Sequence, residues 1–208
     1  MPRPRSLTTD DLATAALAVI DRDGLSALTM RAVANELRMA TMALYRYVTD
    51  RDQLEILVAN RILEPIDVSL PADTDWRDRA TLLLDRIRIA VSAHPAAIPL
   101  TLRHRQSSTA TMRWIEAMLR VLTDAGFTGA DRVIAQRTVV DFLLGYLQNA
   151  HYASLSGPGT NTLAAGSADE FPLLTETAAH ARTMSPADEF DGGTAIILQG
   201  LAARLRKT

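Results

Sequence analysis

Residues 41–48, Thr-Met-Ala-Leu-Tyr-Arg-Tyr-Val, bring together side chains that suit a contact with nucleic acid. Tyr45 and Tyr47 flank Arg46, so that two phenol hydroxyls and a guanidinium lie within three positions. All three groups donate hydrogen bonds of the kind that phosphate oxygens and base edges accept. A helix built only to remain soluble would expose Lys, Glu and Gln instead. The segment therefore predicts a surface that contacts a nucleic acid.

The helical spacing of this segment divides its side chains between two faces. Leu44 and Val48 are four positions apart, so a helix turns both of them toward a core. The outward face would then carry the candidate contact residues Thr41, Met42, Ala43, Arg46 and Tyr47.

Two further helices must hold this segment in place. The first is expected to start near Thr8 and to stop at Gly24, and the second covers residues 30–37 with Thr29 as its N-cap. A tight turn then leads into the helix over residues 41–48. Helices of about eight residues are too short to be stable alone. Packed at an angle, they form a helix-turn-helix whose second helix enters the major groove of DNA.

The rest of the chain also has helical periodicity, and no alternating pattern predicts a strand. We expect an all-α fold in which residues 1–50 form a three-helix DNA-binding domain and residues 51–208 form a larger helical bundle. The Gly- and Ser-containing segment 156–166 is predicted to be a loop. The helices expected in the bundle cover residues 51–64, 76–94, 96–104, 108–125, 130–155, 173–184 and 190–205.

The composition narrows the possible functions. The chain has 208 residues, a net charge of −2 and no cysteine, which leaves no disulfide and no thiolate metal site. Residues 1–61 hold eight Arg against eight Asp or Glu, so DNA binding cannot be argued from bulk charge. No apolar run is long enough for a membrane span, and we expect a cytoplasmic protein. The sequence has no G-x-S-x-G motif, no P-loop, no Gly-rich dinucleotide turn and no cysteine nucleophile. Its four histidines lack metal-ligand spacing, so we expect no catalysis, no cofactor and no bound metal.

Three short motifs resemble one family. Residues 28–34, Leu-Thr-Met-Arg-Ala-Val-Ala, are similar to the opening of the second helix in the tetracycline-repressor (TetR) family of bacterial transcription regulators. Residues 43–48 are similar to the signature of the family's third helix, and residues 51–54, Arg-Asp-Gln-Leu, to the start of its fourth. The spacing between the motifs is that of the family, without a gap.

The resemblance implies a role for each matched position. Thr29 would contact a phosphate and Arg31 a base edge. Bases would be contacted by Thr41, Met42, Ala43 and Arg46, and the DNA backbone by Tyr45, Tyr47 and Arg51. Two alternatives remain open. Met42 and Tyr45 could belong to the core, and Arg46 and Arg51 could form an ordinary solvated face.

The sequence does not decide two features of the N-terminal region, namely the backbone conformation at Arg38 and the contacts of Arg3 and Arg5. The family usually has Gly in the turn between the second and third helices, and this chain has Arg38. If the turn keeps its geometry, Arg38 needs a positive φ, at a cost of roughly 1 kcal/mol. Arg3 and Arg5, which lie among prolines, either reach into a minor groove or contact nothing.

A resemblance in the last helix implies a homodimer. Residues 193–201, Gly-Thr-Ala-Ile-Ile-Leu-Gln-Gly-Leu, are similar to a helix that, in the tetracycline-repressor branch, forms a four-helix interface together with the long helix, here 130–155. A two-fold pair can read a palindromic double-stranded DNA operator. The residues expected at this interface are Val133, Ile134, Val140, Ile197 and Gly200. Alternatively, the two glycines of the motif only permit packing within the chain.

The remaining helices are expected to surround a pocket for a small-molecule effector. Its expected walls are Leu83, Ile87, Leu102, Trp114, Met118, Phe142, Tyr146 and His151. The same residues could instead form an ordinary filled core. Thr101 and Asn149 stand where the tetracycline repressor supplies a metal-coordinating His and a Glu, so the resemblance implies a more apolar effector that carries no metal.

These observations favour a ligand-responsive transcription regulator, with repression favoured over activation. An enzyme and a dimeric ligand carrier that no longer binds DNA are the competing classes. Salt-dependent binding to double-stranded DNA separates them, because contacts with phosphates release counterions.

Overall fold

The computed structural model describes residues 7–206. Every regular element within this range is a helix, which confirms the expected all-α class. The described residues divide into two compact units. One runs to Pro71 and includes Leu82–Ala117, and the other comprises Ala72–Thr81 and the residues from Met118 onward. In this part of the chain, no helix is both long enough and apolar enough to cross a membrane.

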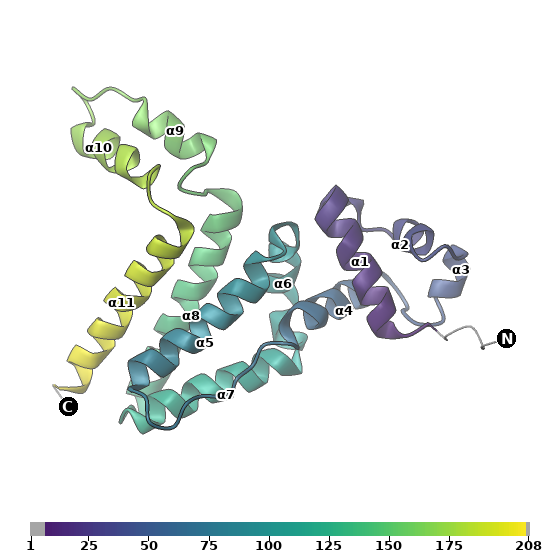
Figure 1. The fold of residues 1–208 in the computed structure, drawn as a ribbon, viewed down its shortest axis with the longest axis horizontal. Coiled ribbons are helices and arrows are strands. Elements are labelled where there is room, and N and C mark those ends of the chain that lie inside the picture. The colour runs from purple at the N-terminus through teal and green to yellow at the C-terminus, as the bar shows by residue number, and fades with distance from the viewer. Residues whose placement is uncertain (1–6, 207–208) are drawn as a thin grey trace. The chain divides into compact units, whose positions relative to one another are not determined.

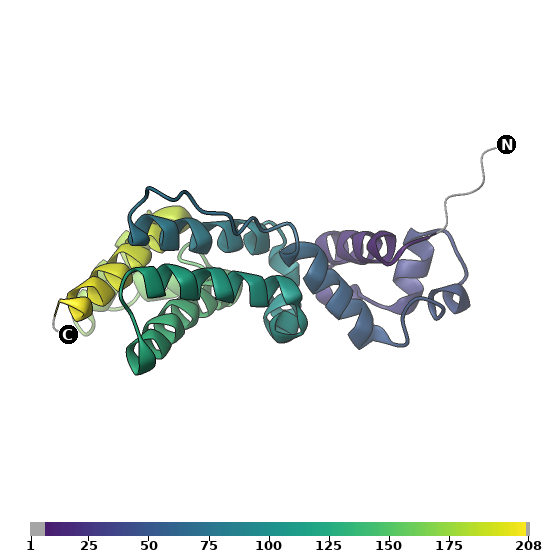
Figure 2. The same ribbon diagram turned by 90° about the horizontal axis from the view of Figure 1, so that it is seen from below.

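The first unit contains the helices expected for the helix-turn-helix. α1 (Thr9–Asp23) packs along α4 (Arg51–Leu63) and against α2 (Met30–Glu36), as Figures 1 and 2 show. α3 (Thr41–Leu44) packs on α2. Apolar side chains from these helices and from the segment before α2 form one core. Its fully buried members include Leu12, Ile20, Leu28, Val33, Leu44 and Val58.

α1 begins and ends where its sequence predicts. Thr8 Oγ1 accepts a hydrogen bond from the Asp11 amide at 3.1 Å, and the Asp11 carboxylate accepts one from the Thr8 amide at 2.8 Å. This capping box satisfies two amides that the helix itself leaves without partners. Gly24 ends the helix with a φ of +85°, which glycine adopts without a steric penalty.

α2 and α4 also begin at capped residues. Thr29 Oγ1 accepts a hydrogen bond from the Ala32 amide at 3.0 Å, and the Asp50 carboxylate accepts one from the Gln53 amide at 2.8 Å. The Gln53 side chain in turn accepts a hydrogen bond from the Thr49 amide at 2.7 Å. Both expected helix starts are confirmed. In α4 the Gln53 side chain returns a hydrogen bond to Thr49, the residue before the N-cap, and not to the N-cap Asp50 itself.

Two longer helices contribute residues to both units, namely α5 (Trp76–Ser92) and α7 (Thr109–Asp124). Between them lies the short helix α6 (Ile98–His104), which packs against α4 within the first unit. Pro95 begins a single 3-10 turn before α6, at the point where the sequence predicts that α5 has ended.

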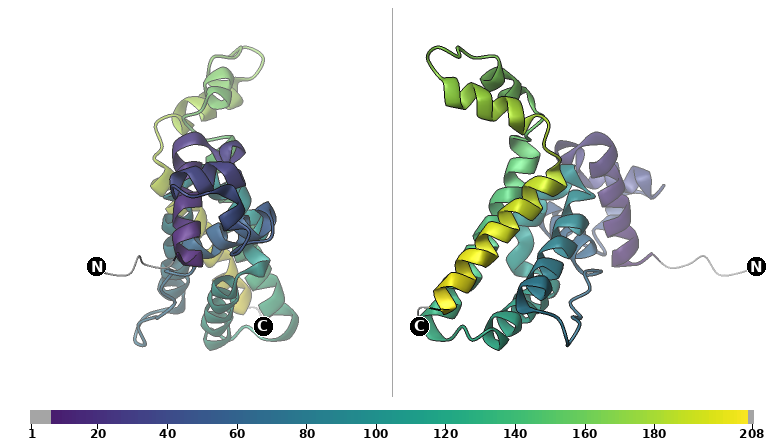
Figure 3. Two further views of the ribbon diagram at one scale, coloured as in Figure 1. Left: turned by 90° about the vertical axis from the view of Figure 1, so that its right-hand side faces the viewer. Right: turned by 60° about the vertical axis from the view of Figure 1, so that its left-hand side comes forward.

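The second unit is built on α8 (Gly129–Tyr152) and α11 (Pro186–Leu205), which lie side by side (Figure 3). Phe190 of α11 stacks on Phe142 of α8, with 5.5 Å between the ring centroids. The Tyr146 ring meets the Phe190 ring edge-on at 4.8 Å. Because aromatic pairs of this kind add to the stability that burial gives, they fix the start of α11 against α8.

α11 approaches α8 closely at Gly193. A Cβ added there would lie 2.6 Å from Cε2 of Phe142, which is closer than two carbon atoms can approach. Gly193 therefore permits close packing within the chain. Gly200 is exposed, and a Cβ added there would meet no atom within 4 Å.

The segment predicted to be a loop contains a helix, so that prediction was wrong. α9 (Pro158–Ala164) forms a hairpin with α10 (Pro172–Ala181), as Figure 1 shows. Pro158 occupies the first turn of α9, where its fixed φ suits a helix and its missing N–H would have had no helical partner. The glycines and the proline at 157–159 therefore mark the start of a helix as well as the end of the preceding turn.

Four helix boundaries lie three or four residues from those expected. α8 ends at Tyr152 instead of Leu155, and α10 ends at Ala181 instead of Met184. α3 ends at Leu44 instead of Val48, because the chain continues as a turn in which the Tyr47 amide donates to the Leu44 carbonyl at 2.8 Å. α11 begins four residues before the expected position. Ser185 is its cap, and Ser185 Oγ accepts a hydrogen bond from the Asp188 amide at 3.1 Å.

Candidate nucleic-acid interface

The turn between α2 and α3 keeps its tight geometry although it contains Arg38 instead of glycine. Arg38 has a φ of +54°. Its amide donates to the Asn35 carbonyl at 3.0 Å, and the Met39 amide donates to the Ala34 carbonyl at 2.9 Å. These two hydrogen bonds form a Schellman motif with Arg38 in the left-handed position. The expected positive φ is confirmed.

α3 and the turn after it separate buried from exposed side chains as predicted. Leu44 and Val48 are buried. Met42 is 76% exposed and Tyr45 is 47% exposed, so the alternative that they belong to the core is wrong. Arg46 is exposed as well. The inward pair thus anchors the segment, whereas Met42, Tyr45 and Arg46 face solvent.

The outward donors keep their hydrogen-bonding capacity. Within the described residues, the side chains of Arg31, Tyr45, Arg46 and Tyr47 have no hydrogen-bond or ion-pair partner. Thr41 and Ala43 lie beside them and are half-buried. A nucleic acid that contacts these donors would therefore displace water and would break no internal hydrogen bond. Arg3 and Arg5 lie outside the described residues.

Thr29 and Arg51 already have partners within the chain. The Thr29 oxygen caps α2, which leaves its hydroxyl hydrogen as a donor. Arg51 Nε donates to Glu55 Oε1 at 2.9 Å. A DNA contact by either residue stays a prediction, and the ordinary solvated-face alternative stays open for Arg51.

Glu55 is a buried carboxylate that the sequence analysis missed. Arg103 Nη1 lies 3.2 Å and His104 Nε2 3.0 Å from its Oε2, while Arg51 occupies Oε1. Burial would raise the pKa of the Glu55 carboxyl. The hydrogen bonds from His104 and Arg51, with the charges of Arg51 and Arg103, outweigh that effect and hold the pKa below its ordinary value. Glu55 and His104 are 49 residues apart, so no local pattern could connect them.

The second unit carries exposed apolar side chains on α8 and α11. Of the residues expected at a dimer interface, three are exposed, namely Val133, Ile134 and Gly200. The other two, Val140 and Ile197, are half-buried. Val133 is 61% exposed. The sequence analysis missed Ile196, which is 72% exposed because buried Thr194 and Leu198 set the inward face of α11.

The residues expected to line a pocket are divided between the two units. Leu83, Ile87, Leu102 and Trp114 belong to the first unit, and Met118, Phe142, Tyr146 and His151 to the second. Trp114 Nε1 donates to the buried Leu83 carbonyl at 2.9 Å, and the Tyr146 hydroxyl donates to the Pro186 carbonyl at 2.9 Å. Such contacts are also found in a filled core, so the choice between core and pocket wall stays open.

One cavity in the second unit does not involve the expected pocket residues. Its volume is about 310 Å³, and its lining includes Phe127, Thr128 and an ion pair between Asp131 and Arg204. None of the eight residues expected to line a pocket belongs to this lining.

Two family models match the chain. Residues 7–55 match the model described as bacterial regulatory proteins of the tetR family, and residues 70–205 match the tetracyclin repressor-like C-terminal domain. The tetracycline repressor protein class A from transposon 1721 of Escherichia coli is 31% identical over 203 residues. This alignment covers 91% of the chain and 88% of that protein.

Two further transcription regulators match the chain over a smaller share of their own length. An HTH-type transcriptional regulator of Saccharopolyspora erythraea is 27% identical over 67% of the chain, and the HTH-type transcriptional repressor DrrR1 of Streptomyces coeruleorubidus is 29% identical over 73% of it. The chain spans 59% and 56% of the lengths of these two proteins.

Solved structures share the fold. A possible TetR family transcriptional regulator from Streptomyces coelicolor A3(2) is 26% identical with a TM-score of 0.85, over 94% of this chain and 99% of that chain. ActR of Streptomyces coelicolor in complex with actinorhodin is 24% identical with a TM-score of 0.77, over 95% and 98% of the two chains. BioQ with its double-stranded DNA operator is 24% identical with a TM-score of 0.71, over 95% and 99%.

Proposed function

Because the chain belongs to the tetracycline-repressor family of bacterial transcription regulators, we propose that it is a repressor that binds a palindromic operator as a homodimer. A small, largely apolar effector releases it from the DNA. In this proposal, residues 1–50 form the DNA-binding domain, and residues 51–208 form the domain that binds the effector and dimerises. The protein acts in the cytoplasm.

The exposed face around α3 carries the proposal. Met42, Tyr45 and Arg46 are held outward, while Leu44 between them is buried. The donors of Tyr45 and Arg46 have no partner within the described residues. In a major groove, an arginine donates to guanine or phosphate, and an apolar side chain contacts the methyl group of thymine. This face offers both kinds of contact.

A dimer follows from the small size of the DNA-contacting face. One helix-turn-helix makes few contacts, whereas a two-fold pair reads two half-sites of a palindrome. α8 and α11 expose Val133, Ile134 and Ile196, which a second copy would remove from water. Exposed Gly200 on α11 lets a second helix approach closely. These features support a four-helix contact between two chains.

The effector is proposed to be an organic molecule without a bound metal. Thr101 and Asn149 stand where the tetracycline repressor has metal ligands, and the Thr101 hydroxyl already donates to the Ala97 carbonyl at 3.0 Å. The residues proposed for the pocket are mostly apolar. ActR, whose fold this chain shares, has been crystallised with actinorhodin and with (S)-DNPA, which supports a small organic ligand.

Release from the DNA is proposed to occur by a shift between two states of the dimer. α4 follows the helix-turn-helix directly, so a movement of α4 changes the separation of the two recognition helices. That separation must be about 34–36 Å, one turn of DNA, or a near multiple of it. The effector releases the DNA only if it binds the other state more tightly.

Substitutions in the exposed face test the proposal. Arg46→Ala and Tyr45→Ala should abolish operator binding and leave the dimer intact, because neither side chain has a partner within the described residues. Fluorescence anisotropy with DNA from upstream of the chain's own gene, at several salt concentrations, measures the effect. The unchanged protein should show a steep salt dependence and a preference over unrelated duplex DNA.

Two results would contradict this proposal. One is an unchanged DNA affinity in both variants, which would mean that the α3 face does not contact DNA. The other is a protein that binds organic ligands as a dimer but has no affinity for any duplex, which would favour the ligand carrier.

A further inference from the structure

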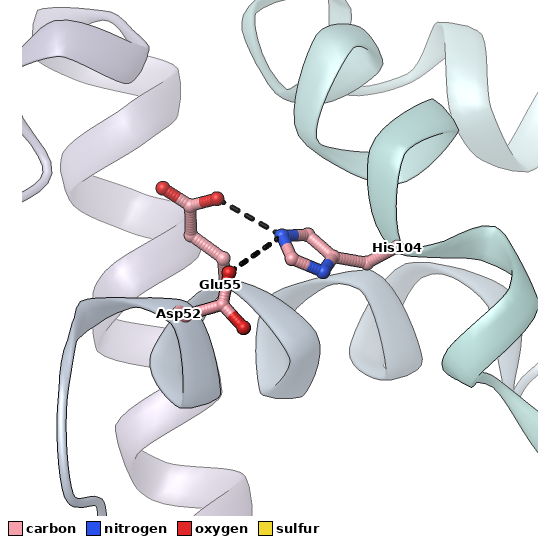
Figure 4. Close-up of side chains that lie close together, drawn as sticks. All are labelled: Asp52, Glu55 and His104. Carbon is pink, nitrogen blue, oxygen red and sulfur yellow. Dashed lines mark hydrogen bonds and ion pairs between the residues drawn. The ribbon is translucent and has the colours of Figure 1, made fainter.

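Three potential metal ligands meet between α4 and α6 of the first unit, as Figure 4 shows. Asp52 and Glu55 are three positions apart on α4 and therefore share a face of the helix, and His104 ends α6. His104 Nε2 lies 3.0 Å from Glu55 Oε2 and 3.7 Å from Asp52 Oδ1. The three ligand atoms all lie within 4.8 Å of one another.

The two separations from His104 suit a small tetrahedral ion. With bonds of about 2.0–2.1 Å to nitrogen and oxygen, two ligands of a tetrahedral Zn²⁺ lie about 3.3–3.4 Å apart. The two distances from His104 Nε2, 3.0 and 3.7 Å, lie on either side of that value. The sequence predicts no bound metal because its histidines lack local ligand spacing, but here the ligands come from two separate helices. We propose that Asp52, Glu55 and His104 bind a divalent transition-metal ion, with Zn²⁺ as the best match and water completing its coordination.

The ligand types favour a transition metal over Mg²⁺ or Ca²⁺. An imidazole nitrogen is a good ligand for zinc and its neighbours, whereas Mg²⁺ and Ca²⁺ prefer oxygen ligands alone. Here one imidazole faces two carboxylates. The mixed nitrogen and oxygen set therefore selects against the two most abundant cellular divalent cations.

Burial holds two of the ligands in place and leaves the third accessible. The side chains of Glu55 and His104 are 4% and 7% exposed, whereas that of Asp52 is 70% exposed. The buried pair loses little further freedom when an ion binds, which favours binding. Asp52 lies at the solvent side, so an ion can enter without opening the core.

The arginines beside Glu55 leave one carboxylate oxygen for the ion. Arg51 Nε donates to Oε1 at 2.9 Å and can orient the carboxylate while Oε2 binds the metal. Arg103 Nη1 lies 3.2 Å from Oε2, and this is the contact that an ion would replace. The Arg103 side chain is 64% exposed, so its guanidinium can return to water at little cost.

This site is separate from the position at which the tetracycline repressor has its metal-coordinating His. The resemblance implies that this position is Thr101, about one turn earlier on α6, whose hydroxyl donates to the Ala97 carbonyl. An ion bound by residues of α4 and α6 would join these two helices. If the proposed function holds, the ion opposes movement of α4 and reduces the ability of the effector to release DNA; this consequence, unlike the site itself, rests on that function.

Zinc binding by the full chain without an affinity tag tests the site independently of DNA. After treatment with a chelator, isothermal titration calorimetry should find one Zn²⁺ per chain, and Mg²⁺ should not compete. His104→Gln and Asp52→Asn should each weaken zinc binding at least about tenfold. Because Asp52 is exposed, its variant stays informative even if the substitution of buried His104 disturbs folding.

His94→Gln is the matched control. His94 Nδ1 lies 2.8 Å from the Asp21 carboxylate in the same unit but belongs to no three-ligand cluster within the described residues. Its loss should leave zinc binding unchanged. An absence of zinc binding in the unchanged protein, or full retention of binding in Asp52→Asn and His104→Gln, would overturn the site.

Operator binding by the metal-free protein, measured in parallel, separates this inference from the proposed function. Zinc binding at the cluster without any operator binding supports the metal site and contradicts the proposed repressor. Operator binding without zinc binding contradicts the metal site and supports the proposed repressor function.

Discussion

Met42 and Leu44 lie two positions apart on α3 and face opposite directions, Met42 largely exposed and Leu44 fully buried. Two positions on an α-helix differ by about 200° around its axis, so neighbours of this kind cannot share a face. Leu44 packs in the core of the first unit, and Met42 lies on its surface. The pair therefore separates, within a single turn of helix, the core from the face that we propose contacts DNA.

Truncating each of these side chains to alanine should have a different effect. Leu44→Ala leaves a cavity and should lower the free energy of unfolding by about 2–5 kcal/mol. Met42→Ala should change it by less than about 0.5 kcal/mol. It should instead weaken operator binding by about 1–2 kcal/mol, roughly 5–30-fold, because apolar surface that the DNA would cover is lost. Urea unfolding and fluorescence anisotropy measure the two quantities. Unchanged operator binding in Met42→Ala would count against the outward face as the contact.

Arg38→Gly should stabilise the protein. A positive φ costs a residue other than glycine about 1–2 kcal/mol, and the greater freedom of glycine in the unfolded chain offsets about 0.5–1 kcal/mol of the gain. The free energy of unfolding should therefore rise by up to about 1 kcal/mol in urea unfolding. Arg38→Ala removes the charge but keeps Cβ, so it should give no gain. Equal gains in both variants would mean that charge, and not backbone strain, is the cause.

The elements that the sequence predicts well are those with local signals. Thr8, Thr29 and Asp50 each accept a hydrogen bond from an amide three positions later, so residue type and spacing alone locate three helix starts. The positive φ of Arg38 follows from the resemblance, because the matching position of the family's turn is usually Gly. The outward position of Met42 follows from its offset relative to Leu44.

The features that the sequence analysis missed depend on distant partners or on ambiguous residues. The contact of Glu55 with His104 joins residues 49 positions apart, and only the packing of α6 on α4 brings them together. α9 was missed because Gly157 and Pro158 are equally typical of a loop and of a helix start. Ile196 and Ile197 are chemically identical, and only the burial of Thr194 on the same helix decides which of them faces outward.

Gly193→Ala should destabilise the second unit. The added Cβ would lie 2.6 Å from the Phe142 ring, and that ring is stacked on Phe190, which limits its movement. We expect a loss of about 1–3 kcal/mol in the free energy of unfolding, as for other overpacked cores. A Cβ at Gly192 would meet no atom within 4 Å, so Gly192→Ala should be neutral or slightly stabilising. If both variants lose the same stability, contact with Phe142 is not the cause.

Ile196→Glu should convert the proposed dimer into a monomer. A single chain tolerates the change because position 196 is exposed, whereas an interface through α11 would bury a carboxylate without a partner. Size-exclusion chromatography with light scattering should then give the mass of one chain, 22.7 kDa, in place of two. Ile89→Glu alters another exposed isoleucine, on α5, and should leave the dimer unchanged. A dimeric Ile196→Glu variant would place the interface elsewhere.

The most direct test of the account is a hydroxyl-radical footprint of the purified chain on DNA from upstream of its own gene. The account predicts two protected segments related by a two-fold axis, with their centres about 34–36 Å apart, or a near multiple of that distance. Protection should disappear in Arg46→Ala. An absence of protection at low ionic strength, or uniform protection without regard to sequence, would contradict the claim that the α3 face of a two-fold pair reads an operator.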